Sequence, residues 1–167
     1  GLSFSSRPDM ATGAISSVTV NALTVRNIGL FRIPIQITVN QLSFNIGTVT
    51  TAGKFKICVY SEDGGTKYID VTSGTNVAGV NNVTVPAVTL PPDNYYVVMG
   101  CASTCNNTVS LWTTTAQAPV NTSVPSGREV YEGTITMTSG KCNSTITTTS
   151  SGITASNSKT PVVRLDY

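Results

Sequence analysis

The 167-residue sequence contains no histidine. Histidine is the usual general base, the commonest metal ligand and the side chain that titrates near neutral pH. Without it, the serine–histidine and cysteine–histidine pairs that activate enzymatic nucleophiles cannot form. We therefore expect a non-enzymatic protein with no catalytic residue and no cofactor.

Charged residues are also scarce, at 11% of the chain, and the formal net charge is +2. The basic residues are scattered, without the basic run interleaved with aromatic residues that is typical of nucleic-acid binding. No apolar run approaches the roughly 18 residues that a membrane helix needs. We expect neither a nucleic-acid partner nor insertion into a membrane.

Helix-favouring glutamate, lysine, glutamine and leucine are few, whereas threonine, valine, serine and asparagine dominate. Short apolar or alternating runs, separated by turn residues, indicate about ten strands and no amphipathic helix. The fold class that we predict is all-β, an antiparallel β-sandwich of the jelly-roll type. An immunoglobulin-like sandwich is the alternative, although Trp112 does not lie between two cysteines at the expected spacing.

The chain divides into two parts by composition. Residues 1–17 are small and polar and predict an N-terminal arm, a type of segment that often holds a neighbouring subunit. Residues 18–167 are expected to form a single β-sandwich domain. Within it, residues 116–127 predict a long connection, and residues 143–159 predict a flexible excursion or a weakly specified strand pair.

Two segments, Gln41–Ile46 and Lys54–Tyr60, show the alternation of a strand with one buried face. The turn at Ser61–Gly65 contains Asp-Gly and Gly-Gly, which predicts a hairpin to Lys67–Val71. Residues Tyr95–Val98 are apolar on both faces, which predicts a central strand. The side chains expected to point into the core are Leu42, Phe44, Ile46, Phe55, Ile57 and Val59.

Four cysteines form an even set, which favours one or two disulfides and an extracellular setting. We prefer a bond between Cys105 and Cys142, because both lie in polar loops that a crosslink would fix. Cys58 and Cys101 lie in or at the end of strands and could equally be buried thiols. The spacing of the four does not fit a structural zinc site.

Two kinds of binding residue stand out. Glu62 and Asp63 are calcium-ligand candidates in the hairpin loop, although two acids are too few alone and a charged turn in solvent is the simpler interpretation. Trp112, Tyr96 and Tyr131 are candidates for stacking on a glycan, with core packing as the alternative. Trp112 is preferred, because its strand meets a threonine-rich loop and its indole N–H needs a partner.

The order of strands and turns from Val18 to Met99 resembles a jelly-roll module common in bacteriophage virion proteins. Asp93-Asn94 replaces the usual glycine after the prolines, and the C-terminal third has no counterpart in that module. The resemblance implies a structural or receptor-binding role on a particle surface and carries over no catalytic site. The matching segments are Leu30–Pro34, Val39–Phe44, Gly53–Gly65, Val83–Val85 and Leu90–Val97.

We therefore predict a structural protein of a virion surface, a capsid decoration or fibre subunit, that assembles as a homo-oligomer. Its expected partners are copies of itself, other virion subunits and a host surface glycan. One alternative is a subunit of an extracellular filament, in which residues 1–17 add a strand to the next subunit. The other alternative is a carbohydrate-binding module of a secreted enzyme.

Overall fold

A computed structural model describes residues 1–115 and 129–167, in which every regular element is a strand. The connection predicted for residues 116–127 lies outside the described residues. No described residue belongs to a helix that could cross a membrane. The strands are β1 (Ser3–Ser5), β2 (Ala11–Val20), β3 (Val25–Ile33), β4 (Ile37–Thr51), β5 (Phe55–Ser61), β6 (Lys67–Thr72), β7 (Gly79–Leu90), β8 (Asp93–Cys101), β9 (Asn106–Thr114), β10 (Glu132–Thr136), β11 (Ile153–Ala155) and β12 (Val163–Asp166).

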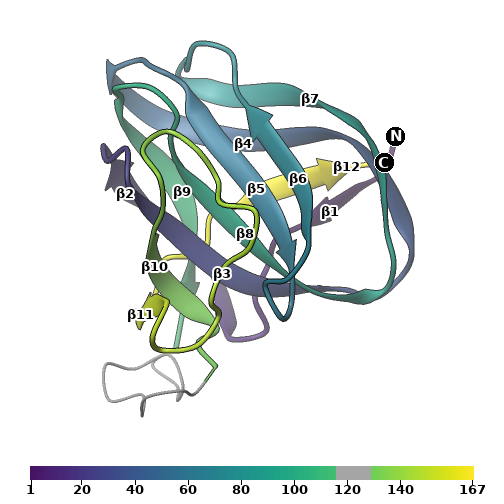
Figure 1. The fold of residues 1–167 in the computed structure, drawn as a ribbon. Coiled ribbons are helices and arrows are strands. Elements are labelled where there is room, and N and C mark those ends of the chain that lie inside the picture. The colour runs from purple at the N-terminus through teal and green to yellow at the C-terminus, as the bar shows by residue number, and fades with distance from the viewer. Residues whose placement is uncertain (116–128) are drawn as a thin grey trace.

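The strands form two antiparallel sheets that face each other (Figure 1). Sheet A contains neighbours in the order β2, β9, β4 and β7, and sheet B contains β3, β8, β5 and β6. These two four-stranded orders, built from β2 to β9, are those of a jelly roll. The predicted antiparallel sandwich is confirmed, and the immunoglobulin alternative is wrong. β12 and β1 extend sheet A, while β10 and β11 extend sheet B beside β3.

Residues 1–17 are part of the sandwich, so the predicted separate arm is wrong. β1 pairs with β12 and β2 pairs with β9, both inside sheet A. The backbones of Leu2 and Tyr167 exchange two hydrogen bonds, of 3.0 and 2.9 Å, which brings the two ends of the chain together (Figure 1). The polar composition of these residues reflects the solvent exposure of β2 rather than an absence of pairing.

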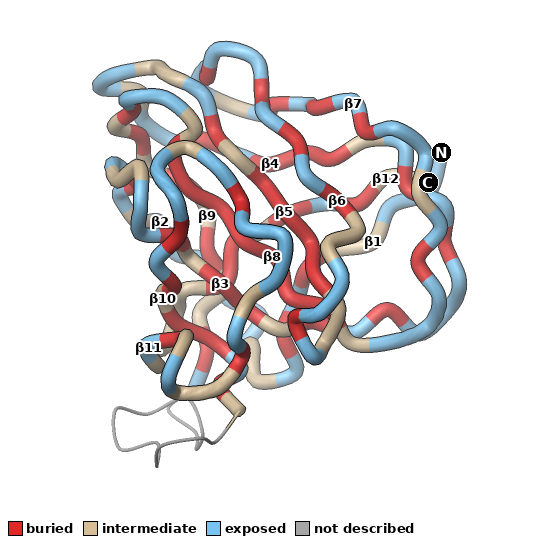
Figure 2. The backbone as a smooth tube through the Cα atoms, in the orientation of Figure 1, coloured by how far each residue is buried: buried red, intermediate tan, exposed pale blue. Residues whose placement is uncertain are grey.

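The main core lies between the sheets, and the six predicted inward residues of β4 and β5 are all buried in it. Phe44 and Phe55 meet there across the two sheets, with ring centroids 5.5 Å apart. Figure 2 shows β5 and β8 buried along almost their whole length. The predicted central strand is confirmed, because β8 lies between β3 and β5.

A second core covers the outer face of sheet B over β3, β5 and β8. It forms because residues 138–152, here called the covering segment, cross that face between β10 and β11 (Figure 1). The hydroxyl of Tyr60 donates to the carbonyl of Asn143 at 2.6 Å, and the hydroxyl of Tyr96 donates to that of Val130 at 2.6 Å. This segment includes much of the excursion predicted for residues 143–159, and it is fixed by its contacts with the sheet.

A buried arginine also ties the covering segment to the sheet. The guanidinium of Arg26 donates to the carbonyls of Cys101 at 2.8 Å and Lys141 at 3.0 Å. Gly100 makes room for it, since a Cβ there would lie 2.3 Å from the Arg26 Cδ. The cation thus satisfies backbone acceptors that the excursion would otherwise leave without partners.

Both disulfides differ from the preferred pair. Cys58 bonds to Cys142, and Cys101 bonds to Cys105. Cys58 points away from the main core, on the face of β5 that the covering segment crosses, and Cys142 lies in that segment. The preference for Cys105 with Cys142 was wrong because the loop containing Cys105 turns back onto the end of its own strand, β8.

Candidate functional site

A groove runs across the outer face of sheet A, with a volume of ≈ 350 Å³. We call it the Trp112 groove. Strands β1, β4, β7, β9 and β12 all contribute to it. It is lined by Ser3, Ser5, Ser43, Phe44, Asn45, Val80, Trp112, Val162 and Arg164.

The strand alternation explains why polar side chains face this groove. On β4, Leu42 and Ile46 enter the main core, so Ser43 and Asn45 point to the opposite face. On β12, Val163 and Leu165 are buried in that core, and Arg164 between them is exposed. The same pattern that builds the core therefore supplies the polar lining of the groove.

A hydrogen-bonded network holds the polar end of the groove in place. The Asp166 carboxylate accepts from Gln41 Nε2 at 2.8 Å and from Arg164 Nε at 3.0 Å. The Ser43 hydroxyl lies 3.0 Å from Asp166 Oδ2 and 2.8 Å from Asn82 Oδ1, and its single hydrogen serves either acceptor. Partial burial opposes ionisation of Asp166, but these hydrogen bonds and the Arg164 charge hold its pKa below the usual range.

Trp112 forms the aromatic end of the groove. Its side chain is half-buried, and the Arg7 guanidinium lies over the indole, 5.7 Å from the ring centroid. The indole Nε1 is buried and has no partner among the described residues. Ile15 of β2 lies directly across the strand pair from Trp112 and is 55% exposed. The half-buried indole thus contributes an aromatic surface to the groove, beside the Arg7 cation.

The other two aromatic candidates are not near this ring. Tyr96 is completely buried in the second core, so it has no ring face to offer and is wrong as a glycan-stacking candidate. Tyr131 is 37% exposed and lines a different hollow of ≈ 210 Å³, together with Met10, Arg32 and Glu62. Of the three, Trp112 alone lines the groove on sheet A.

The calcium candidates lie in the hairpin between β5 and β6, which forms as predicted. Asp63 Oδ1 accepts from the Ser61 hydroxyl at 2.7 Å and from the Gly65 N–H at 2.9 Å, and these bonds lower the pKa of its carboxyl. Glu62 accepts from Asn94 Nδ2 at 3.2 Å. These contacts close the turn, as the charged-turn alternative expects. Calcium binding in this loop stays a prediction.

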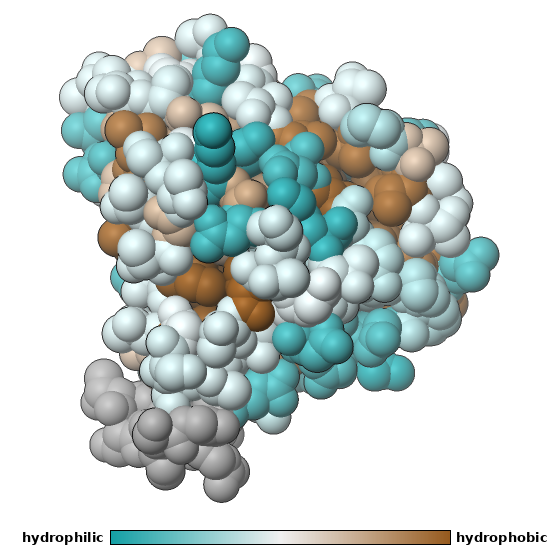
Figure 3. All heavy atoms as spheres, viewed as in Figure 1, coloured by the Kyte–Doolittle hydropathy of each residue, from teal (hydrophilic) through white to brown (hydrophobic). Residues whose placement is uncertain are grey.

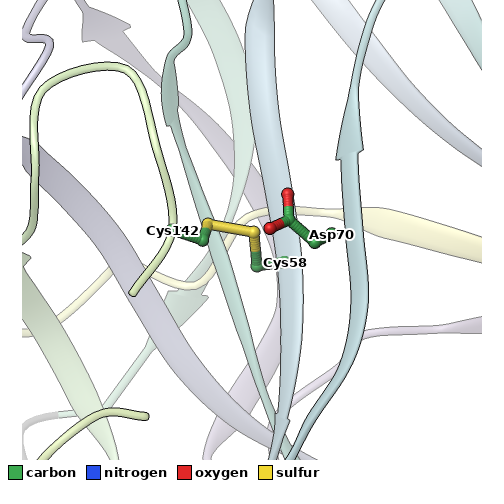
Figure 4. A group of neighbouring side chains, drawn as sticks. All are labelled: Cys58, Asp70 and Cys142. Carbon is green, nitrogen blue, oxygen red and sulfur yellow. A yellow bond between two sulfur atoms is a disulfide. The ribbon is translucent and has the colours of Figure 1, made fainter. Parts of the chain in front are cut away.

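One further group, Cys58, Asp70 and Cys142, brings three potential metal ligands within 4.8 Å of one another (Figure 4). The two sulfur atoms are bonded to each other, however, and so are not thiolate ligands. Asp70 instead forms ion pairs with Lys56 at 2.8 Å and Lys67 at 2.7 Å. Figure 3 shows hydrophilic side chains gathered over β5 and β6, where these pairs lie. This group is structural.

The Asp70 pairs give a testable pH dependence. Partial burial opposes ionisation, but hydrogen bonds and charge from Lys56 and Lys67 hold the pKa of Asp70 below its usual value. The stabilisation is therefore present above the unfolded-state pKa and is lost as the pH falls through the lower folded-state pKa. Asp70→Asn should cost about 1 kcal/mol at neutral pH and flatten the loss of stability as the pH falls below about 4, the unfolded-state pKa of an aspartate. Urea unfolding across that range, with Asp93→Asn as the control, measures this, and an unchanged acid limb contradicts it.

A buried acid that no sequence pattern indicated lies at the other end of sheet B. Glu132, the first residue of β10, is 1% exposed. Its Oε1 accepts from the N–H groups of Lys159 at 2.6 Å and Thr160 at 2.9 Å, and from the Thr160 hydroxyl at 3.1 Å. Its Oε2 accepts from the Thr114 hydroxyl at 2.6 Å. Glu132 thus joins β9 and β10 to the segment that leads into β12.

Comparison with known proteins assigns no family. No family model and no curated protein matches the chain. Among solved structures, the cysteine protease and lectin-like domains of Cwp84 from Clostridium difficile match at 12% identity and a TM-score of 0.45, over 97% of this chain and 37% of that one. Chitosan-binding module 1 of a chitosanase/glucanase from Paenibacillus sp. IK-5 matches at 17% identity and a TM-score of 0.34, over 65% and 89%.

A third structure, the CBM32 of AlyQ in complex with 4,5-unsaturated mannuronic acid, matches at 18% identity and a TM-score of 0.38, over 65% of this chain and 88% of that one. The chain spans only about a third of the solved Cwp84 chains. Similarity at this level does not assign a function to the chain.

Proposed function

We propose that this chain is a non-catalytic, extracellular binding domain and that the Trp112 groove binds a glycan. The observation that carries the proposal is the presence, on one sheet face, of an aromatic side chain and an ordered polar network in a shallow groove. The two disulfides support an oxidising environment outside the cytosol.

The chemistry of a sugar matches both ends of the groove. The apolar C–H face of a pyranose ring packs against an aromatic surface, which Trp112 provides. The hydroxyl groups of a sugar need donors and acceptors in fixed positions. Of the residues that line the groove, Arg164 donates, and Ser43 and Asn45 can donate or accept, while Asp166 holds Ser43 and Arg164 in position. Because Asp166 and Ser43 are already held by hydrogen bonds, little side-chain entropy is lost when a ligand binds.

Arg7 is part of this proposal because it lies over the indole. Its side chain is exposed, and its hydrogen bond to the Ala11 carbonyl is 3.4 Å long, so a ligand can displace the guanidinium from the ring at small cost. A sugar then stacks where the guanidinium lay, and the guanidinium becomes a donor at the edge of the groove.

Replacing Trp112 by alanine is expected to weaken glycan binding by about 2 kcal/mol, or roughly 30-fold, because the central stacking surface is lost. A glycan array identifies the ligand and calorimetry then compares the variants. Trp112→Phe keeps the ring but lacks the N–H, so it should retain part of the affinity if stacking dominates. Tyr131→Ala, in a different hollow, is the matched control. Equal affinity of the wild type and the Trp112→Ala variant, or no bound glycan on the array, contradicts the proposal.

We also propose, from the sequence resemblance, that the domain belongs to a virion surface as a decoration or fibre subunit. An extracellular filament subunit remains the alternative, but without residues 1–17 acting as a free arm that inserts into the next subunit, because β1 and β2 already pair with β12 and β9 of their own sheet. Isolation of the chain from purified particles would support the virion assignment, and its recovery only from a cellular filament or a free secreted enzyme would contradict it.

A further inference from the structure

One strand edge of this sandwich lacks the usual protection against pairing. Edge strands in natural proteins are kept short, charged or interrupted by proline or bulges, because their free N–H and C=O groups recruit other strands. β1 and β11 have only three residues each, and β6 carries the charged residues Lys67 and Asp70. β7 contains Pro86, and its register with β4 shifts between Val39 and Gln41.

β2 differs from these four strands. It has ten residues without a charge or a proline, and residues 12–17 are all exposed. Within residues 1–115 and 129–167, it pairs with β9 alone. Its register is irregular only between Ala11 and Ile15, and it runs regularly from Ile15 to Val20. From Ile15 to Val20 this leaves a regularly paired, uncharged strand at the edge of the sheet, with an exposed isoleucine.

We propose that β2 pairs antiparallel with β2 of a second copy of this chain, which joins two sheets A into one continuous sheet. A two-fold axis near Ser17, in the regular half of the strand, places Ser17 against its own copy and Ile15 against Thr19 of the second copy. In such a pairing, a charge at or next to the two-fold axis lies close to the identical charge of the second copy, which is unfavourable. The absence of charge from β2 removes this penalty, and a second copy is therefore the occupant that its composition suits.

The pairing has a consequence for the Trp112 groove. Trp112 lies on β9, next to β2, and points to the same sheet face as Ile15. In the joined sheet the order is β9, β2, β2 and β9, so the two β9 strands lie about 14 Å apart, at three strand spacings. Two grooves then open on one surface, and a polymeric ligand can bind both. The pairing itself does not depend on the identity of the ligand.

Charge variants at Ser17 test the proposal by sedimentation velocity from micromolar to millimolar concentration. The wild type should form a dimer, and Ser17→Lys and Ser17→Glu should each raise the dimer dissociation constant on the order of tenfold or more, since like charges face each other. An equimolar mixture of the two variants should dimerise again, because lysine then faces glutamate. Only a contact that brings Ser17 close to its own copy predicts this rescue.

Thr72→Lys is the matched control, because it adds the same charge to an exposed position on β6, an edge that is already charged. Circular dichroism and the melting temperature verify folding of each variant, and Ser17→Arg replaces Ser17→Lys if the latter unfolds. A wild type that stays monomeric throughout overturns the proposal. So does a mixture that fails to dimerise, or a Thr72→Lys variant that dissociates as readily as Ser17→Lys. Glycan binding by a monomer would leave the proposed function intact while refuting the pairing.

Discussion

Replacing Cys58 and Cys142 together by alanine is expected to lower the free energy of unfolding by roughly 4.5 kcal/mol. The bond closes a chain segment with a sequence separation of 84, and a crosslink of that length removes a large part of the entropy of the unfolded chain. It also holds the covering segment on β5, inside the second core. Loss of the bond should therefore expose Tyr60 and Tyr96, whose hydroxyl groups donate to the carbonyls of Asn143 and Val130.

Denaturant unfolding measures the loss, and tyrosine fluorescence or hydrogen exchange locates it. The matched control is the double alanine variant of Cys101 and Cys105, whose sequence separation is only 4. The same entropy relation gives roughly 2 kcal/mol for this short loop. If both variants lose the same stability, the long crosslink does not act through chain entropy.

Glu132→Ala is expected to cost about 3–5 kcal/mol, because it removes the buried acceptor of four donors. The N–H groups of Lys159 and Thr160 and the Thr114 hydroxyl would lose their partner together. Since these donors belong to β9 and to the segment before β12, the C-terminal strand should loosen from sheet A.

Two further variants make this prediction sharper. Glu132→Gln keeps one acceptor oxygen but turns an amide N–H₂ toward a donor, so an intermediate loss of about 1–3 kcal/mol is expected. Asp9→Asn removes a negative charge from an exposed residue and should change stability by less than about 0.5 kcal/mol. Thermal and urea unfolding compare the three variants. If Glu132→Ala lowers the free energy of unfolding no more than Asp9→Asn does, the Glu132 carboxylate does not stabilise the fold.

The sequence could predict the parts of the fold that depend on local patterns. Alternation places Leu42, Phe44 and Ile46 on one face because side chains alternate along any strand. The doubly apolar pattern of Tyr95–Val98 is explained by two cores, since β8 is buried on both faces. The disulfides could not be predicted in the same way. Alternation indicates that Cys58 leaves the main core, but it does not indicate which distant loop covers that face.

In the candidate site, too, local patterns indicate some residues, whereas others come together only through the pairing of distant strands. The sequence indicates Trp112 because its strand meets a threonine-rich loop and its indole N–H needs a partner. The sequence does not indicate Ser43, Arg164 and Asp166 as a group. Ser43 on β4 lies more than 120 residues from the other two, which are on β12, although each occupies an outward position in its strand. A prediction that β4 and β12 pair would have found them. The prediction of a separate arm over residues 1–17 was wrong for a related reason, since polar, exposed edge strands resemble linkers in composition.

The covering segment makes the two outer faces of this sandwich different. Over sheet B, this segment is held by a disulfide, a buried guanidinium and tyrosine hydroxyl groups. The central strands of sheet B are therefore buried on both faces. The outer face of sheet A, in contrast, keeps its side chains in solvent. Binding through the Trp112 groove, as proposed, would therefore fix the orientation of the domain on a large surface, with sheet A toward the ligand and the covering segment away from it.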